Sequence, residues 1–215
     1  MRINKEYSKK LVDDRIKLQN ENKDRLYIFL FEGVGSDAST DSRKNAMCVA
    51  VKNEKIVYLN MYCSTIPDQP HNPWSTANEK GMPTLKDGIY DIQPVNHDGY
   101  RALNTTANGE VPVVRYNRNE QYDNSAALGI YIHRRYNNYL RKNSQGCMLI
   151  GRIPGEADDY LSFLKSIGLE SKDVKELGTN ELWVEGKAIV DRNYAYDYLS
   201  NVGYSDEAIK MIRGY

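Results

Sequence analysis

Short apolar and β-branched segments, separated by polar or Gly/Asn-rich turns, recur along this chain of 215 residues. Runs of about four to eight such residues are typical of strands, whereas helices need longer periodic patterns. The predicted strands are 26–31, 46–51, 55–62, 88–92, 111–116 and 129–133. The second and third are separated by residues 52–54 alone, as in a hairpin. The pattern therefore predicts a mainly β (α+β) domain, a sandwich or barrel with flanking helices.

Helical patterns lie on both sides of these strands. Residues 4–24 are highly charged with apolar positions on a rough helical period, and residues 160–167 repeat apolar side chains at i, i+3, i+4 and i+7. Residues 181–184 and 187–190 predict a hairpin, and 194–202 and 205–212 predict two short helices. The expected organisation is an N-terminal helix (1–24), a main domain (25–168), and a C-terminal hairpin and helices (169–215) packed on that domain.

Charge and hydropathy exclude several classes of protein. Lysines and arginines number 29 and aspartates and glutamates also 29, so the chain has no overall basic field and nucleic acid is not an expected partner. The longest apolar run, 26–31, is too short to cross a bilayer, and the charged first residues lack the apolar region of a signal peptide. We expect a soluble protein without a membrane span or signal peptide; compartment and oligomeric state do not follow from the sequence.

Three patterns that could indicate a dinucleotide site, a zinc site and a disulfide framework lack features that these structures need. Residues 33–38 fit the letters G-x-G-x-x-A after a predicted strand, but a dinucleotide site needs a helix to begin there, and only a short polar stretch precedes the next strand. His71, His97, His133 and Cys147 lack the short pairwise spacing of a zinc site. The three cysteines are too few for a disulfide framework. No metal and no cofactor are therefore expected.

The segment from 129 to 151 carries the candidate chemistry. His133 ends a predicted strand, and Ser144, Gly146 and Cys147 precede another apolar run. Two neighbouring strands could hold the imidazole beside the thiol, so that His133 accepts the thiol proton and the thiolate attacks a carbonyl. Backbone amides around Gly146 and Cys147 could stabilise the oxyanion, and Ser144 could orient the imidazole or donate to substrate. Without such a pairing, Cys147 would be an inert buried cysteine.

These residues resemble the YkuD-type L,D-transpeptidase family. His133, followed after ten residues by Ser144, one residue, Gly146 and Cys147, is similar to the family's signature of a histidine, a spacer and Ser/Thr-His-Gly-Cys. Segments 53–59 and 81–92 look like its opening hairpin and its T-P-x-G-x-Y/F-x-I strand, and the resemblance spans about residues 45–167. It implies an L,D-transpeptidase-like fold in which Cys147 takes an acyl group from a peptidoglycan stem peptide and passes it to an amine or to water. His133 would be general base and acid, with Ser144 and Gly146 shaping the oxyanion site.

The chain departs from the family pattern at three points. Gln145 replaces the histidine of the signature, Leu149 stands where an arginine is common, and the spacer is shorter. Arg134, Arg135 or Arg152 could supply the missing positive charge; the substrate-binding candidates are Arg134, Arg152, Gln145 and Tyr131. Two alternatives remain. One is a catalytically inactive wall-binding or structural module on the same fold, and the other is a cysteine peptidase acting on proteins.

Overall fold

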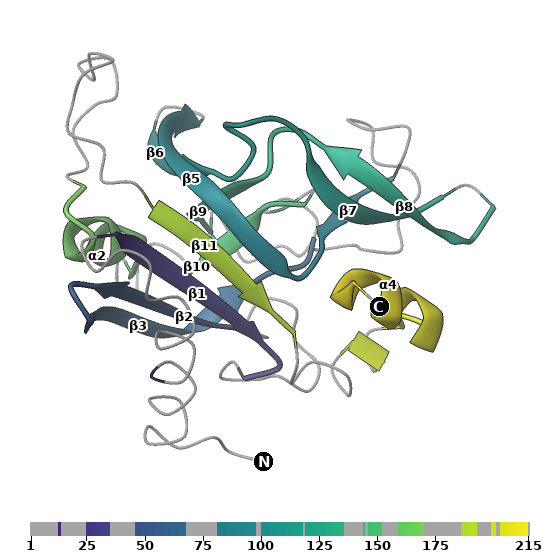
Figure 1. Ribbon diagram of the computed structural model, residues 1–215, viewed down its shortest axis with the longest axis horizontal. Helices are drawn as coiled ribbons and strands as arrows, with labels where there is room; N and C mark the ends of the chain where they lie inside the picture. Colours follow the sequence, from purple (N-terminus) through teal and green to yellow (C-terminus); the bar gives the residue numbers. More distant parts are fainter. Residues whose placement is uncertain are drawn as a thin grey trace.

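The computed structural model describes residues 13, 25–34, 46–67, 81–97, 100–117, 119–135, 144, 146–151, 159–169, 186–192, 199–200 and 203–214. Within these residues the chain is mainly β, with an eight-stranded closed barrel and a separate three-stranded sheet (Figure 1). This confirms the predicted mainly β class. Of the predicted N-terminal helix only Asp13 is described, and it is helical. The predicted strand at 181–184 and most of the proline-rich loop at 64–83 lie outside the described residues, as does the G-x-G-x-x-A motif beyond Val34.

The barrel wall mixes local hairpins with long-range pairings. In order around the wall its strands are β1 (Leu26–Glu32), β11 (Gly186–Asp191), β5 (Gly88–His97), β6 (Tyr100–Asn104), β9 (Tyr131–Arg134), β10 (Met148–Ile150), β3 (Lys55–Ser64) and β2 (Ala46–Lys52). The β1–β11 and β9–β10 pairs are parallel and the other pairs antiparallel. Pairing of β2 with β1 closes the ring.

The predicted hairpin across 52–54 is confirmed. β2 pairs with β3 from Lys52 and Lys55 onwards, and Asn53 and Glu54 in the turn have φ values of 51° and 59°. Two successive residues with positive φ are the mark of a type I′ turn, whose twist matches that of the strands it joins. Asparagine tolerates this conformation well, but glutamate adopts it only at some cost in strain.

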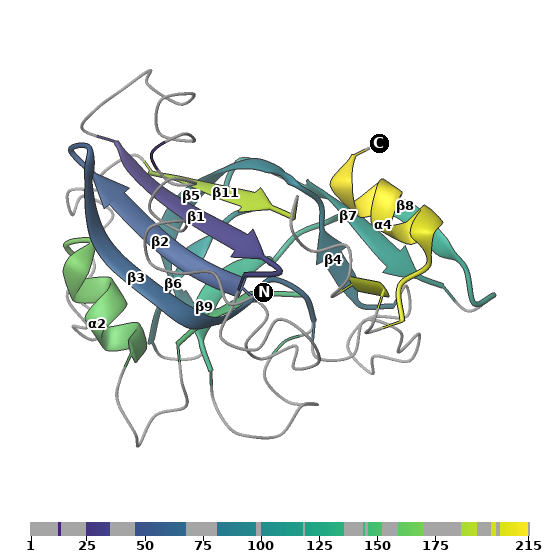
Figure 2. The same ribbon diagram turned by 90° about the horizontal axis from the view of Figure 1, so that it is seen from below.

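A second sheet and a helix stand at one end of the barrel. The sheet has the order β4 (Pro83–Leu85), β7 (Val111–Tyr116), β8 (Tyr122–Ala127), and helix α4 (Asp206–Arg213) packs against it. α4 begins where the Ser205 side chain accepts a hydrogen bond from the Ala208 amide. Helix α2 (Asp159–Ser166) lies at the opposite end of the barrel, as Figures 1 and 2 show. Both helices are where the sequence predicts them.

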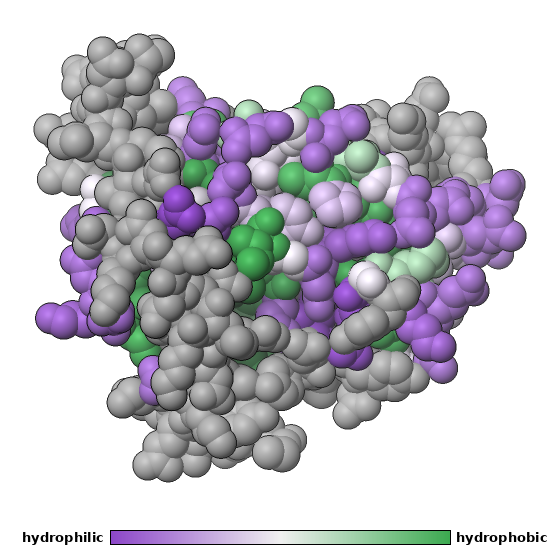
Figure 3. All heavy atoms as spheres, viewed as in Figure 1, coloured by the Kyte–Doolittle hydropathy of each residue, from purple (hydrophilic) through white to green (hydrophobic). Residues whose placement is uncertain are grey.

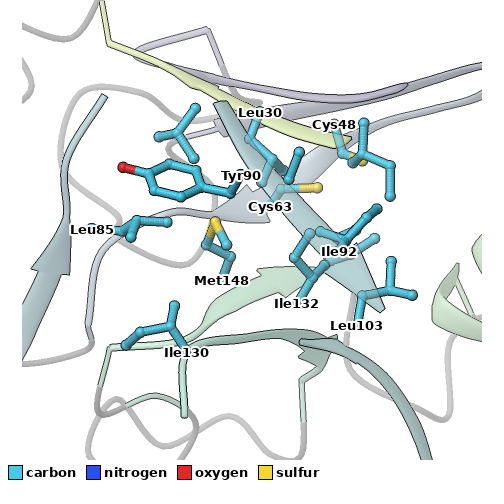
Figure 4. Close-up of a cluster of buried hydrophobic side chains, with 14 of the residues drawn as sticks. Leu30, Cys48, Cys63, Leu85, Tyr90, Ile92, Leu103, Ile130, Ile132 and Met148 are labelled. Atoms are coloured by element: carbon cyan, nitrogen blue, oxygen red, sulfur yellow. The ribbon is translucent and has the colours of Figure 1, made fainter. Parts of the chain in front are cut away.

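The barrel interior holds the main hydrophobic core. Inward side chains from every barrel strand meet there, among them Leu30, Ile92, Leu103, Ile132 and Met148 (Figure 4). β11 contributes Ala188 and Val190, because it lies between β1 and β5 in the wall. The sequence groups this strand with an appended C-terminal segment, whereas in the structure it is an integral part of the barrel.

The surface is polar with local apolar patches. On the face seen in Figure 3, hydrophobic groups gather over β5 and β11, where Ile89 is 49% exposed, and hydrophilic groups surround them. Leu128, immediately before Gly129, is 63% exposed. No helix in the described part of the chain is long and apolar enough to span a membrane.

Candidate functional site

Two adjacent parallel strands position the predicted histidine and cysteine. On β9 and β10, Ile132 lies opposite Met148, and both side chains belong to the barrel core. Side chains alternate along a strand, so His133 points to the other face. Cys147 directly precedes Met148, the first residue of β10, and its Sγ lies 3.7 Å from the carbonyl oxygen of Gly129, two residues before β9. The pairing of β9 with β10 thus places His133 and Cys147, fourteen positions apart in sequence, on neighbouring backbone segments.

The orientation of the His133 ring is set by a backbone hydrogen bond. Its Nδ1 lies 2.7 Å from the carbonyl oxygen of Arg134, and the residue is only 1% exposed. Since a carbonyl oxygen only accepts, Nδ1 carries the hydrogen in this contact. In the neutral imidazole the lone pair is therefore on Nε2, which is the tautomer a general base needs.

The loop before β10 is held by the Ser144 hydroxyl. Its Oγ accepts a hydrogen bond from the Gly146 amide at 3.1 Å and donates one to the Cys147 carbonyl at 2.6 Å. A hydroxyl has one hydrogen to donate, and in this arrangement Ser144 donates it within the loop. Its predicted role in orienting the imidazole or donating to substrate stays a prediction. The Gly146 amide is likewise engaged, and an oxyanion donor from this loop would have to be another amide.

Gly146 sits where no other residue fits. Its φ is +140°, and a Cβ built there would lie 2.6 Å from Cγ and 2.9 Å from the carbonyl oxygen of Pro83. Real Cβ atoms do not approach so closely, and this φ is strained for L side chains. The close contact joins the cysteine loop to β4 of the second sheet, a neighbour that the sequence did not indicate.

Cys147 differs from the other two cysteines in its exposure. It is partly exposed, and its Sγ lies 3.7 Å from the carbonyl oxygen of Gly129 as a weak donor. Cys48 and Cys63 are completely buried in the barrel core, and burial raises the pKa of the Cys48 thiol well above its usual value. Of the three, Cys147 is thus the thiol that a solute can reach.

A cluster of rings surrounds His133. The His97 ring centroid lies 5.2 Å from that of His133 and 4.5 Å from that of Tyr131, and Tyr100 lies 6.4 Å from His133. The guanidinium of Arg134 stacks over the Tyr100 ring at 4.6 Å. The sequence indicates no role for His97, because its place beside His133 depends on the pairing of β6 with both β5 and β9.

The remaining predicted substrate-binding residues are only partly described. Tyr131 and Arg134 belong to the ring cluster around His133, whereas Gln145 and Arg152 lie outside the described residues. Nε of the buried Arg135 donates to the Gly151 carbonyl at 3.4 Å. Within the described ranges no three His, Cys, Asp or Glu side chains are grouped to hold a metal ion.

A surface hollow of about 600 Å³ lies elsewhere, between the β7–β8 hairpin and the start of α4. Tyr116, Tyr122 and Glu207 are among the residues that line it, and none of the described candidate residues does. The size of a surface hollow alone therefore does not point to the candidate site around Cys147.

No known family model, curated protein or solved structure matches this chain.

Proposed function

We propose that this protein is a cysteine-dependent acyl-transfer enzyme with Cys147 as nucleophile and His133 as general base and acid. The observation behind the proposal is that His133 on β9 and Cys147, the residue just before β10, lie on neighbouring backbone segments of one parallel strand pair, with the imidazole oriented by its Nδ1 hydrogen bond. A partly exposed thiol and a buried, oriented imidazole are the two groups from which an activated cysteine nucleophile is built.

The reaction would proceed in two steps. His133 Nε2 takes the thiol proton, Sγ bonds to the carbonyl carbon of the donor, and the amide C–N bond breaks as the imidazolium returns the proton to the leaving amine. An amine or water then attacks the thioester carbon, the C–S bond breaks, and the proton passes back through His133 to the thiolate. The net reaction exchanges or hydrolyses one amide bond and needs no oxidant.

The substrate class rests on the resemblance to the YkuD-type L,D-transpeptidases. A stem peptide of peptidoglycan supplies an amide carbonyl as donor and an amine as acceptor, which is what the two steps require. The barrel architecture and the order of hairpin, Pro83 strand, His133 strand and Cys147 along the chain support this assignment. The protein would then act at the cell wall.

Whole-protein mass spectrometry after incubation with purified muropeptides or a carbapenem tests the proposal. We expect an acyl adduct on the wild type, none on Cys147→Ala, and slow formation on His133→Ala. Cys63→Ser is the matched control, since Cys63 is a cysteine buried in the core and its loss should leave the adduct unchanged.

A small thiol reagent separates a wrong substrate from a wrong mechanism. With iodoacetamide at pH 6, an activated Cys147 is alkylated much faster than a free cysteine peptide, and His133→Ala removes that advantage. If the wild type reacts no faster than the peptide, Cys147 is an ordinary thiol. The wall-binding module without catalysis would then replace the enzyme.

A further inference from the structure

Arg115 lies beside the cysteine loop, although 32 positions of sequence separate it from Cys147. On β7, Val113 packs into the barrel core and Val114 packs under α4. Because side chains alternate, Arg115 shares the barrel-facing side with Val113. Its cross-strand neighbour on β4 is Pro83, the residue against which Gly146 packs. Arg115, Pro83 and the cysteine loop are thus consecutive neighbours in space.

The guanidinium of Arg115 is buried without full compensation. The residue is 6% exposed, its Nη1 donates to the Gly81 carbonyl, and its Nε has no hydrogen-bond partner among the described residues. Burial lowers the pKa of Arg115, and the charge of Glu110 only partly offsets this. The facing residue on β8, Asp123, accepts a hydrogen bond from Asn117. Within the described ranges no carboxylate forms an ion pair with Arg115.

Arg192, whose side chain is completely buried, differs from Arg115 in its ionic partners. Arg192 binds Glu32 through Nε and Asp87 through Nη1 at 3.1 Å, and these carboxylates raise its pKa despite burial. A buried cation usually has such partners, because an uncompensated one costs several kcal/mol. Arg101 and Arg135 are buried too, so burial alone does not single out Arg115. Its place next to Pro83, which contacts the cysteine loop, makes it the buried cation to which a ligand at Cys147 could supply an anion.

We propose that Arg115 binds a carboxylate of the acyl donor held at Cys147. A planar guanidinium can form two parallel hydrogen bonds with a carboxylate, and these are strong where water is excluded. The substrate is thereby specified as a peptide with a free carboxylate near the amide that reacts. The cation comes from the second sheet and differs from the sequence-based candidates Arg134, Arg135 and Arg152. The reaction part of this inference rests on the proposed function.

A binding experiment on Cys147→Ala tests the carboxylate site without any chemistry. The probes are N-acetyl-alanyl-alanine and its C-terminal amide, which differ only in the charge of the terminal group. We expect the acid to bind at least about tenfold more tightly than the amide, as a charge-assisted contact requires, and to shift the Nε–H resonance of Arg115 in NMR spectra. Adding Arg115→Gln should equalise the two affinities. Adding Arg213→Gln, the same change on α4, should leave the preference intact.

The outcomes separate this inference from the proposed function. Equal affinities for acid and amide, or a preference that survives Arg115→Gln, overturn the carboxylate site. If Arg115→Gln does not fold, the shift of the Arg115 resonance in the Cys147→Ala protein decides: a shift with the acid alone supports the site, and no shift refutes it. If the acid binds at Arg115 but the wild type forms no acyl adduct, the anion site stands and the cysteine mechanism fails. If the wild type forms an acyl adduct but the acid and the amide bind equally well, the cysteine mechanism stands and the carboxylate site fails.

Discussion

Gly146 is the residue whose environment is most restrictive in the candidate site. Gly146→Ala would place a Cβ into Pro83, whereas Gly109→Ala adds one at φ +124° with nothing within 4 Å. Both changes carry the strain of positive φ, about 1 to 2 kcal/mol. We expect Gly146→Ala to lower stability further and to slow alkylation of Cys147 at least about tenfold, because the loop must move. Gly109→Ala should leave the alkylation rate unchanged.

Urea denaturation and iodoacetamide kinetics on the two variants check this expectation. Equal losses of stability and unchanged thiol reactivity in both would show that the contact between Gly146 and Pro83 does not hold the loop.

The predictability of the site also differs from residue to residue. His133 and Cys147 can be found from sequence because each adjoins a short apolar run, which predicts neighbouring strands. No sequence pattern indicates the role of Ser144 inside the loop, because that role depends on which backbone groups form hydrogen bonds with its hydroxyl. His97 and Arg115 approach the site only through strand pairings distant in sequence. Local periodicity carries no information about such pairings.

At the scale of the elements, a buried ionic cluster joins the ends of three strands. Arg192 follows β11, Glu32 ends β1 and Asp87 precedes β5. Nη2 of Arg192 also donates to the carbonyl oxygen of Thr65, which follows β3, at 3.0 Å. The Thr65 hydroxyl in turn donates to Glu32 at 2.7 Å. Burial raises the pKa of Glu32 and of Asp87, and the charge of Arg192 opposes both shifts.

Arg192→Met should therefore be strongly destabilising. It leaves two carboxylates buried without their cation, a cost of about 3 to 5 kcal/mol in the free energy of unfolding. Lys187→Met is the matched control, since it removes a 3.2 Å pair with the exposed Asp91 and should cost less than about 1 kcal/mol. Chemical denaturation at pH 7 measures both.

The pH dependence of this loss identifies its cause. Without Arg192 the two carboxyl groups take up protons more readily in the native state than in the unfolded chain, so stability rises as the pH falls through their raised pKa values. The cost of Arg192→Met should therefore shrink at acid pH. A cost no larger than that of Lys187→Met, or independent of pH, would mean that the cluster is not held by charge.

Element prediction succeeded where the signal is local. β1, β2, β3 and β7 are apolar or β-branched runs, and α4 has a serine cap and a glycine end, so their sequences indicate them directly. β4, β6 and β8 were not predicted as strands. β8 reads Tyr-Asp-Asn-Ser-Ala-Ala and lies at the edge of its sheet with only Ala127 buried, so burial imposes little apolar pattern on it. The place of β11 between β1 and β5 is a long-range choice that its own sequence does not encode.

At the scale of the whole molecule, buried tyrosine hydroxyls make the fold sensitive to alkali. Burial raises the pKa of Tyr90 to about 12, with Arg192 acting in the opposite direction, and its hydroxyl donates to the Lys86 carbonyl at 2.7 Å. Tyr58, Tyr122 and Tyr204 have pKa values raised by burial in the same way. These residues lie in the barrel and in the second sheet and α4 region, so ionisation opposes folding at both ends of the molecule.

The sign follows from proton binding. Between pH 10 and 12 the Tyr90 hydroxyl ionises in the unfolded chain but stays protonated in the folded one, so the unfolded state binds fewer protons and the free energy of unfolding falls as the pH rises. A difference of two pKa units corresponds to at most about 3 kcal/mol.

Tyr90→Phe removes this contribution together with the hydrogen bond to Lys86, which is worth about 1 kcal/mol. At pH 8 the wild type should therefore be more stable than Tyr90→Phe, and by pH 12 this advantage should vanish or reverse. Denaturation curves of both proteins at several pH values measure the difference, and a difference that does not change with pH would show that the Tyr90 hydroxyl ionises equally in both states.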